Sequence, residues 1–151
     1  MGVFDTFSIN ASGLTAERFR MDLISENIAN ANTTRTKNGG PYHRKVATFV
    51  EKNDPHASFA SVLASQSKYN RTNALGVKVG GVYEDTIDPD VMVYDPAHPD
   101  ADENGYVMYP NVNIITEMTN LIDASRAYEA NATAFSTSKA LAQQGLTIGQ
   151  G

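Results

Sequence analysis

The sequence predicts an α+β fold in which long N- and C-terminal helices pair as a coiled-coil-like hairpin, with a small β-rich insert between them. In both terminal stretches, apolar residues recur at helical spacing, as in amphipathic helices that face another helix. The middle of the chain alternates every second residue and is broken by turns that contain proline, which is typical of short strands. We therefore expect residues 1–34 plus 111–151 to form a helical core domain and residues 35–110 to form the insert.

The first helix is expected to begin near Asp5 or Thr6, either of which can cap it, and to run to about Asn30. Two apolar series with a spacing of seven run along it: Phe7, Leu14, Met21 and Ile28, and Ile9, Ala16 and Leu23. Because the series start two residues apart, they lie on different sides of the helix. We expect one side to pair with the C-terminal helix. The other side would stay exposed in a lone chain, and exposed apolar stripes mark contact surfaces.

The second helix is expected to follow a cap at Asn111 or Asn113 and to run towards the chain end. Its apolar seam recurs in steps of four and three: Ile114, Met118, Leu121, Ser125, Tyr128, Ala132, Phe135, Lys139, Ala142 and Leu146. No proline or glycine interrupts this run before Gly145, so the helix would be about 50 Å long. That length exceeds what a small domain needs, so part of its surface is expected to meet other chains.

Between the helices, the residues predict turns and short strands. The asparagines and threonines of residues 27–34 favour bonds from side chain to backbone and should end the first helix. Strands are expected at 42–51, 75–83, 91–94 and 105–109, separated by turns that contain glycine or proline. Residues 58–67 show no clear period and are expected to form a mobile loop.

Composition excludes several classes of protein. The chain of 151 residues has a net charge of −5, and its lysines and arginines are scattered, so it lacks the basic surface of a nucleic-acid-binding protein. It has no cysteine, which excludes disulfides and cysteine metal sites. It also has no run of about 20 apolar residues that could span a membrane, and no standard secretory signal. If it acts outside the cytoplasm, it must leave by another route.

One stretch resembles part of a calcium loop. Asp100, Asp102, Asn104 and Gly105 match its first half, but Asn111 stands where the bidentate glutamate should be, and no helix precedes the stretch. A polar turn is therefore the favoured interpretation. His43, His56 and His98 lie far apart and lack the spacing of metal ligands.

No catalytic or phosphate-binding motif is present. No serine lies in a G-x-S-x-G elbow, and neither pair of adjacent glycines opens a helix as a phosphate loop does. Arg18, Arg20 and Arg126 are expected to form ion pairs with acidic residues of the helices, such as Glu17, Asp22, Glu26 or Glu129. Tyr128, Asn131 and Phe135 have the spacing of packing residues rather than of a ligand site. We expect no enzyme activity and no cofactor.

Both chain ends resemble the signatures of flagellar rod and hook proteins. The N-terminal signature residues are Ser12, Gly13, Leu14, Arg18, Asn27, Asn30, Asn32 and Thr33. The C-terminal ones include Asn111, Asn113, Glu117, Leu121, Arg126, Tyr128, Asn131 and Lys139. Residues 94–110 resemble the insert of the C-type proximal rod group, whereas residues 51–74 carry no recognisable motif.

This resemblance implies a bacterial structural subunit that is exported unfolded through the flagellar type III apparatus. Such subunits assemble helically in the periplasm as the rod that joins the membrane ring to the distal rod and hook. Their terminal helices form an inner coiled-coil layer around the export channel. The implied partners are like subunits, other proximal and distal rod proteins, and proteins of the membrane ring and export apparatus. Neither nucleic acid nor a small-molecule substrate is implied.

The residues expected at the assembly interface are Phe7, Ile9, Leu14, Met21, Leu23, Ile28, Ile114, Met118, Leu121, Tyr128, Phe135 and Leu146. The alternative function is a secreted type III adaptor that binds a single partner through its helix hairpin, and a helical-bundle enzyme ranks third. A lone rod subunit should show weak helical circular dichroism at its ends and gain helix on assembly. An adaptor should be stably folded alone.

Overall fold

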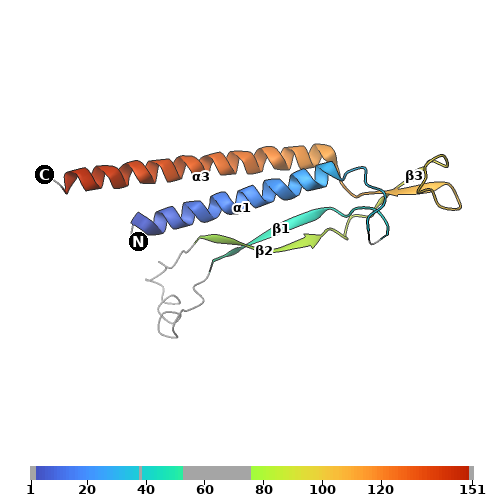
Figure 1. Ribbon diagram of the computed structural model, residues 1–151, viewed down its shortest axis with the longest axis horizontal. Helices are drawn as coiled ribbons and strands as arrows, with labels where there is room; N and C mark the ends of the chain where they lie inside the picture. Colours follow the sequence, from blue (N-terminus) through green and yellow to red (C-terminus); the bar gives the residue numbers. More distant parts are fainter. Residues whose placement is uncertain (1–2, 38, 53–75, 150–151) are drawn as a thin grey trace, which may run out of the picture. The chain divides into compact units, whose positions relative to one another are not determined.

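The computed structural model describes residues 3–37, 39–52 and 76–149. Its elements in chain order are α1 (Val3–Ala29), β1 (Lys45–Glu51), β2 (Val77–Glu84), β3 (Val91–Tyr94), β4 (Tyr106–Tyr109) and α3 (Ile114–Ile148) (Figure 1). The outline of the predicted fold is confirmed, because a helix at each end flanks an insert of two 2-stranded sheets. The loop expected at 58–67 and His56 lie outside the described residues.

The ends of the helices follow from local hydrogen bonds. The Oδ1 atom of Asn113 accepts bonds from the backbone N–H groups of Ile115 and Thr116 at 3.0 and 3.2 Å, which confirms Asn113 as the cap of α3. After α1, the Nδ2 group of Asn30 donates to the carbonyl of Glu26, and the hydroxyl of Thr33 donates to Asn30. These side-chain bonds end α1 as predicted. At its other end α1 begins at Val3, before the expected caps, so Asp5 lies in the first turn.

The two sheets are both antiparallel hairpins. β1 and β2 are bordered by backbone bonds from Asp85 to Arg44 at 2.7 Å and from Lys52 to Gly76 at 2.9 Å. β3 and β4 pair in a register that runs from Val91 opposite Tyr109 to Tyr94 opposite Tyr106. β1 begins at Lys45 rather than at residue 42, and β4 begins after Gly105, whose φ of 81° is left-handed and therefore not extended. The predicted start of the second strand, Leu75, lies outside the described residues.

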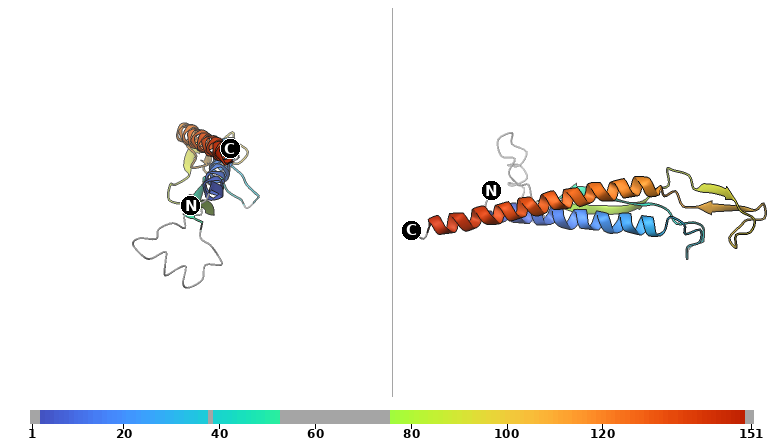
Figure 2. Two further views of the ribbon diagram at one scale, coloured as in Figure 1. Left: turned by 90° about the vertical axis from the view of Figure 1, so that its left-hand side faces the viewer. Right: turned by 90° about the horizontal axis from the view of Figure 1, so that it is seen from above.

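Internal contacts group the chain into two units. Unit 1 comprises Met1–Arg18, Phe49–Gly80 and Arg126–Gly151, and unit 2 comprises Phe19–Thr48 and Gly81–Ser125. In unit 1, α1 and α3 are antiparallel, because Phe7 contacts Phe135 and Gly13 lies against Asn131. In unit 2, the end of α1 lies beside the start of α3 (Figure 2), where Asn27 bonds to Glu117. The division into a helical core domain and an insert domain stays a prediction.

α1 is covered around most of its circumference. Its exposed positions form one narrow stripe in steps of three and four: Asp5, Ser8, Ala11, Thr15, Arg18, Asp22, Ser25 and Ala29. The expectation that a second apolar side stays exposed in a lone chain is wrong, because the first hairpin covers it. In unit 1, Gly76 lies against Ile9 and Ser12, and in unit 2 the backbone of Lys45 bonds to Asn27.

α3 is mostly exposed, and its covered side coincides with the predicted seam only in part. The covered seam positions are Leu121, Ser125, Ala132, Phe135 and Ala142, whereas Ile114, Met118, Tyr128, Lys139 and Leu146 are exposed. A further covered series spaced by seven, Glu117, Ala124, Asn131 and Ser138, stands one residue before seam positions, so the covered side is shifted towards it. Small side chains explain this shift, because they allow helices to approach closely. A Cβ atom on Gly13 would lie only 3.1 Å from the side chain of Asn131.

Most of the large apolar side chains of α3 are therefore exposed, whereas Leu121 and Phe135 are half-buried. The exposed ones are Ile114, Ile115, Met118, Ile122, Tyr128, Leu141, Leu146 and Ile148. None of the described helices combines the length and the apolar character needed to cross a membrane.

Candidate functional site: a buried polar node

A cluster of polar side chains joins four segments within unit 2: the end of α1, the chain around the start of β1, the residue after β2, and the start of α3. We call it the polar node and define it by Asn27, Tyr42, Arg44, Lys45, Asp85, Asn111 and Glu117. Asn27 lies in the last turns of α1 and Glu117 in the first turn of α3, and each is only 1% exposed. Buried polar groups are unfavourable unless they are hydrogen-bonded, so the partners of these two residues decide whether the node stabilises the fold.

Asn27 makes every hydrogen bond that its side chain allows. Its Nδ2 group donates to the carbonyl of Lys45 and to Oε2 of Glu117, both at 2.9 Å. Its Oδ1 atom accepts from the hydroxyl of Tyr42 at 2.8 Å and from the backbone N–H of Lys45 at 2.9 Å. A side-chain amide has two N–H donors and an oxygen with two lone pairs, so Asn27 is saturated. An apolar residue at position 27 would leave these partners unpaired.

Glu117 holds the charged part of the node. Its Oε1 atom accepts from Nε of Arg44 at 2.8 Å and from Nδ2 of Asn120 at 3.3 Å. The guanidinium of Arg44 also bonds to Asp85, with Nη1 3.3 Å from Oδ2. Arg44 therefore bridges the carboxylate of α3 and the carboxylate that follows β2.

Asn111 connects the node to the segment before β3. Its Oδ1 atom accepts from the backbone N–H of Arg44 at 2.9 Å. Its Nδ2 group donates to the carbonyls of Asp85 and Asp88 at 2.7 and 3.0 Å. Asn111 thus fixes three backbone segments, which is a different role from the helix cap that the sequence suggested.

The surroundings of Tyr42, Arg44 and Asp85 shift the pKa of each of these groups. Burial raises the pKa of Tyr42 to about 12, and the nearby carboxylates of Glu26 and Glu117 add to this, so Tyr42 remains a hydroxyl donor. Burial is the largest influence on Arg44 and by itself would lower its pKa, but the hydrogen bonds and charges of Glu117 and Asp85 together outweigh burial and raise that pKa. The backbone N–H of Ile87 lowers the pKa of Asp85, and Arg44 contributes to this shift. Because these donors and acceptors engage one another, the node is suited to fix chain segments rather than to transfer protons.

The helix contact in unit 1 has a different chemistry. The rings of Phe7 and Phe135 meet edge to face with centroids 5.1 Å apart. The hydroxyl of Ser12 donates to the carbonyl of Ile9 at 2.7 Å and accepts from the backbone N–H of Val77 at 3.0 Å. A Cβ atom on Gly76 would lie 2.1 Å from that hydroxyl oxygen, so this position requires glycine.

The structure brings together some signature residues and leaves others apart. Asn27 and Glu117 meet in the node, Gly13 and Asn131 meet in unit 1, and Asn30 and Thr33 meet in the turn after α1. Ser12, Leu14 and Leu121 are half-buried, and the exposed signature residues are Arg18, Asn32, Asn113, Arg126, Tyr128 and Lys139. Sequence reasoning missed Tyr42, Arg44, Lys45 and Asp85. For these residues no signal was available, because their partners lie far away in the chain.

The residues expected at the assembly interface divide by exposure. Leu23 is buried, and the half-buried ones are Phe7, Ile9, Leu14, Met21, Ile28, Leu121 and Phe135. The exposed ones are Ile114, Met118, Tyr128 and Leu146. That these residues contact other chains stays a prediction.

The stretch that resembles a calcium loop forms a hydrogen-bonded turn. Oδ1 of Asp102 accepts from the backbone N–H groups of Asn104 and Tyr106 at 2.9 and 2.8 Å. The carboxylate of Asp100 accepts from Thr34 at 2.8 Å and pairs with Arg35 at 3.4 Å. Across the described ranges, no group of three or more histidines and acids is placed to hold a metal ion.

Known proteins resemble this chain at both ends. Residues 7–37 match the family described as flagella basal body rod protein. Residues 103–148 match the family described as flagellar basal body rod FlgEFG protein C-terminal. The first range contains Asn27 and the second contains Glu117, so the two matched ends meet in the polar node.

Curated relatives resemble the chain over its whole length. A flagellar basal-body rod protein FlgC from Borreliella burgdorferi is 42% identical over 156 residues and covers 100% of both chains. A FlgC from Bacillus subtilis (strain 168) is 43% identical over 154 residues, which are 99% of this chain and 100% of the relative. A FlgC from Escherichia coli O157:H7 is 36% identical over 150 residues, again 99% and 100% of the two chains.

Proposed function

Because this chain belongs to the flagellar basal-body rod protein FlgC family, we propose that it assembles helically as a subunit of the proximal rod. The family is a structural one of the flagellar basal body, not an enzyme family. In our proposal the chain is exported through the flagellar type III apparatus and assembles in the periplasm. There it links the membrane ring to the distal rod and hook, with like subunits and other rod proteins as neighbours.

The observation that carries this proposal is the uncovered apolar surface of α3. Met118 and Ile122 are each 54% exposed, and Leu146 is 68% exposed. Burying one such side chain contributes about 1.5–3 kcal/mol, so a chain that leaves them in water gains by assembly. Large contiguous apolar patches on a monomer usually mark interfaces. We infer that α3 packs against helices of neighbouring subunits in a coiled-coil-like layer that lines the export channel.

The polar node supports the mechanical part of the proposal. A drive shaft transmits torque, so the joint between its helices and its insert must resist deformation. A saturated network in a densely packed interior meets this need, because it has few alternative arrangements of similar energy. In this view the node holds the insert at a fixed angle to the helices of unit 2.

One observation favours the alternative, an adaptor that binds a single partner. The first hairpin covers α1 within the lone chain, and an adaptor is expected to be stably folded alone. The C-terminal end of α3 distinguishes the two functions, because Leu141, Leu146 and Ile148 are exposed there. A rod subunit should gain helical circular dichroism at this end when it assembles. An adaptor should show the same helical content with and without other subunits.

A charged substitution on the exposed surface of α3 tests the proposal. Met118→Asp should abolish incorporation into basal bodies and swimming in soft agar, because it buries a charge wherever α3 meets another subunit. Thr119→Asp is the matched control, since it adds the same charge at the neighbouring exposed position. Both variants should keep the circular dichroism of the unmodified chain. Normal swimming by Met118→Asp would contradict the proposal.

A further inference from the structure

The second hairpin carries an apolar face that nothing in unit 2 covers. The register pairs Met92 with Met108 and Tyr94 with Tyr106, so these four side chains share one face of the β3–β4 sheet. They are 62%, 42%, 64% and 40% exposed in that order. The two tyrosine rings meet edge to face with centroids 5.2 Å apart. We call this surface the Met/Tyr face. Methionine and tyrosine are enriched in the cores of protein interfaces, and no charged residue lies on this face.

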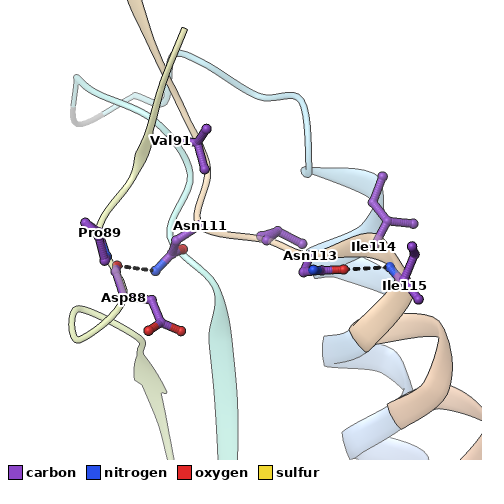
Figure 3. A pocket seen from close by; sticks show the side chains of 8 residues that line it. Asp88, Pro89, Val91, Asn111, Asn113, Ile114 and Ile115 are labelled. Atoms are coloured by element: carbon purple, nitrogen blue, oxygen red, sulfur yellow. Dashed lines mark hydrogen bonds between the residues drawn. The ribbon is translucent and has the colours of Figure 1, made fainter.

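A groove lies on the other side of the same hairpin. Strand alternation places Val91 and Val107 on the opposite face, and Val91 walls a groove of about 600 Å³ together with Val112, Ile114 and Ile115. Figure 3 shows Asp88 and Pro89 on one side of this groove and the start of α3 on the other. We call it the Val/Ile groove. Ile114 is 43% exposed and Ile115 is 78% exposed, so its apolar wall is open to water.

The chemistry of the two surfaces is complementary. The lining of the groove is apolar except for Asp88, Asn111 and Asn113. Asn111 and Asn113 use their side chains on backbone groups, whereas the carboxylate of Asp88 accepts no hydrogen bond from the described part of the chain. Tyr94 and Tyr106 of the Met/Tyr face each carry a hydroxyl group that can donate a hydrogen bond to this carboxylate. Their rings and the methionines supply the apolar surface that the groove can bury.

We propose that the Met/Tyr face of one copy of this chain seats in the Val/Ile groove of the next copy. The proposal rests on the rod function and names the surface through which neighbouring copies meet. The two surfaces are unlike, because one is a face of the hairpin and the other lies between Val91 and the start of α3, so each copy offers one surface to each neighbour. Such head-to-tail contacts propagate around a ring or a helix, whereas a two-fold dimer needs like surfaces. A two-stranded hairpin is only marginally stable by itself, and this contact would stabilise it.

Cross-linking within isolated basal bodies tests the contact. The chain has no cysteine, so introduced cysteines are the only ones it contains. Met108→Cys combined with Ile115→Cys places one thiol on each surface, and a short bismaleimide should join copies into a ladder of two, three and more chains. Either cysteine alone should give no ladder. Met108→Cys with Asp22→Cys is the control pair, because Asp22 lies on the exposed stripe of α1.

The possible outcomes distinguish a failure of this contact from a failure of the proposed rod function. If basal bodies lack the unmodified chain, the rod function itself fails. If they contain the double-cysteine chain but its ladder does not exceed that of the control pair, only the surface assignment is overturned. Dimers formed by Met108→Cys alone would indicate contact between like surfaces and would also overturn it. So would a cross-link to a different protein in place of a second copy.

A pair of charge substitutions tests the same contact without introduced cysteines. Met92→Asp would bring a second carboxylate to Asp88 of the neighbouring copy, and incorporation should fall about tenfold or more, since like charges at an interface are strongly unfavourable. Adding Asp88→Lys to the same chain should restore incorporation, because the lysine of each copy then meets the aspartate of the next. If the second change restores nothing, the pairing of these two surfaces is wrong.

Discussion

The helix contacts of the two units differ in kind. In unit 2, a buried hydrogen bond between Asn27 and Glu117 joins α1 to α3, whereas in unit 1 the helices meet through aromatic rings and a glycine. An apolar contact tolerates small shifts, because van der Waals attraction has little directionality. The bonds of Asn27 and Glu117 form in one register only, since each atom needs its partner within about 3 Å. The polar contact of unit 2 therefore specifies the register of the helices more sharply than the apolar contact of unit 1 does.

Removing the carboxylate of Glu117 from the polar node should have the largest effect on the free energy of unfolding. Glu117→Ala leaves the guanidinium of Arg44 and the amide of Asn27 without their acceptor. We expect the free energy of unfolding to fall by about 3 kcal/mol, at the low end for a broken buried pair because Arg44 is 25% exposed. Urea denaturation followed by circular dichroism measures this. Glu129→Ala, at an exposed position of the same helix, should change it by less than about 0.5 kcal/mol. Equal stability of the two variants would contradict the role of the node.

Adding a side chain at Gly13, in the close helix contact of unit 1, should lower the free energy of unfolding by a smaller amount. A side chain on Gly13 would meet that of Asn131 at 3.1 Å, so Gly13→Val should lower the free energy of unfolding by about 1–3 kcal/mol. Asn131→Ala in the same chain should recover a large part of the loss, because it removes the atoms that clash. Urea denaturation of the four chains of this double-mutant cycle measures the coupling. Simple additivity would show that the contact does not cause the effect.

Tyr42 in the polar node should also make the free energy of unfolding depend on pH. The pKa of Tyr42 is raised from 10.0 to about 12, so the folded chain holds this proton more tightly than the unfolded chain does. Its contribution is therefore complete below pH 10 and is lost as the pH rises to 12. Tyr42→Phe should flatten the fall of the unfolding free energy across this window. Tyr83→Phe, at a side chain that is 60% exposed, should keep the slope of the unmodified chain.

An exposed ion pair should have the smallest effect. Arg35 pairs with Asp100 at 3.4 Å, but its side chain is 76% exposed, so Arg35→Ala should lower the free energy of unfolding by less than about 0.5 kcal/mol. The same denaturation experiment measures it. A loss of more than about 1 kcal/mol would mean that burial is not what distinguishes the node from ordinary surface pairs.

Much of the fold could be predicted from local patterns. The apolar periods predicted both terminal helices, Asn113 was expected as a cap, and the strand at 91–94 appears with the predicted bounds. Such features depend on residues a few positions apart, and the sequence shows those residues directly. The same patterns could not predict which side of each helix is buried. The seam of α3 was predicted from its large apolar residues, but helices approach most closely where side chains are small, and the covered side is shifted towards Ala124 and Asn131.

The candidate site could be predicted only in part. Asn27 and Glu117 were picked out because they match a family signature, yet nothing nearby in the chain showed what they bind. They stand 90 residues apart, and Arg44 lies 73 residues from the carboxylate it pairs with. The positions of helices, turns and caps can be predicted from the residues alone, because they depend on short-range sterics and hydrogen bonds. Which buried polar groups meet, and which apolar face stays in water, depends on packing between segments far apart in the chain and became apparent only in the folded structure.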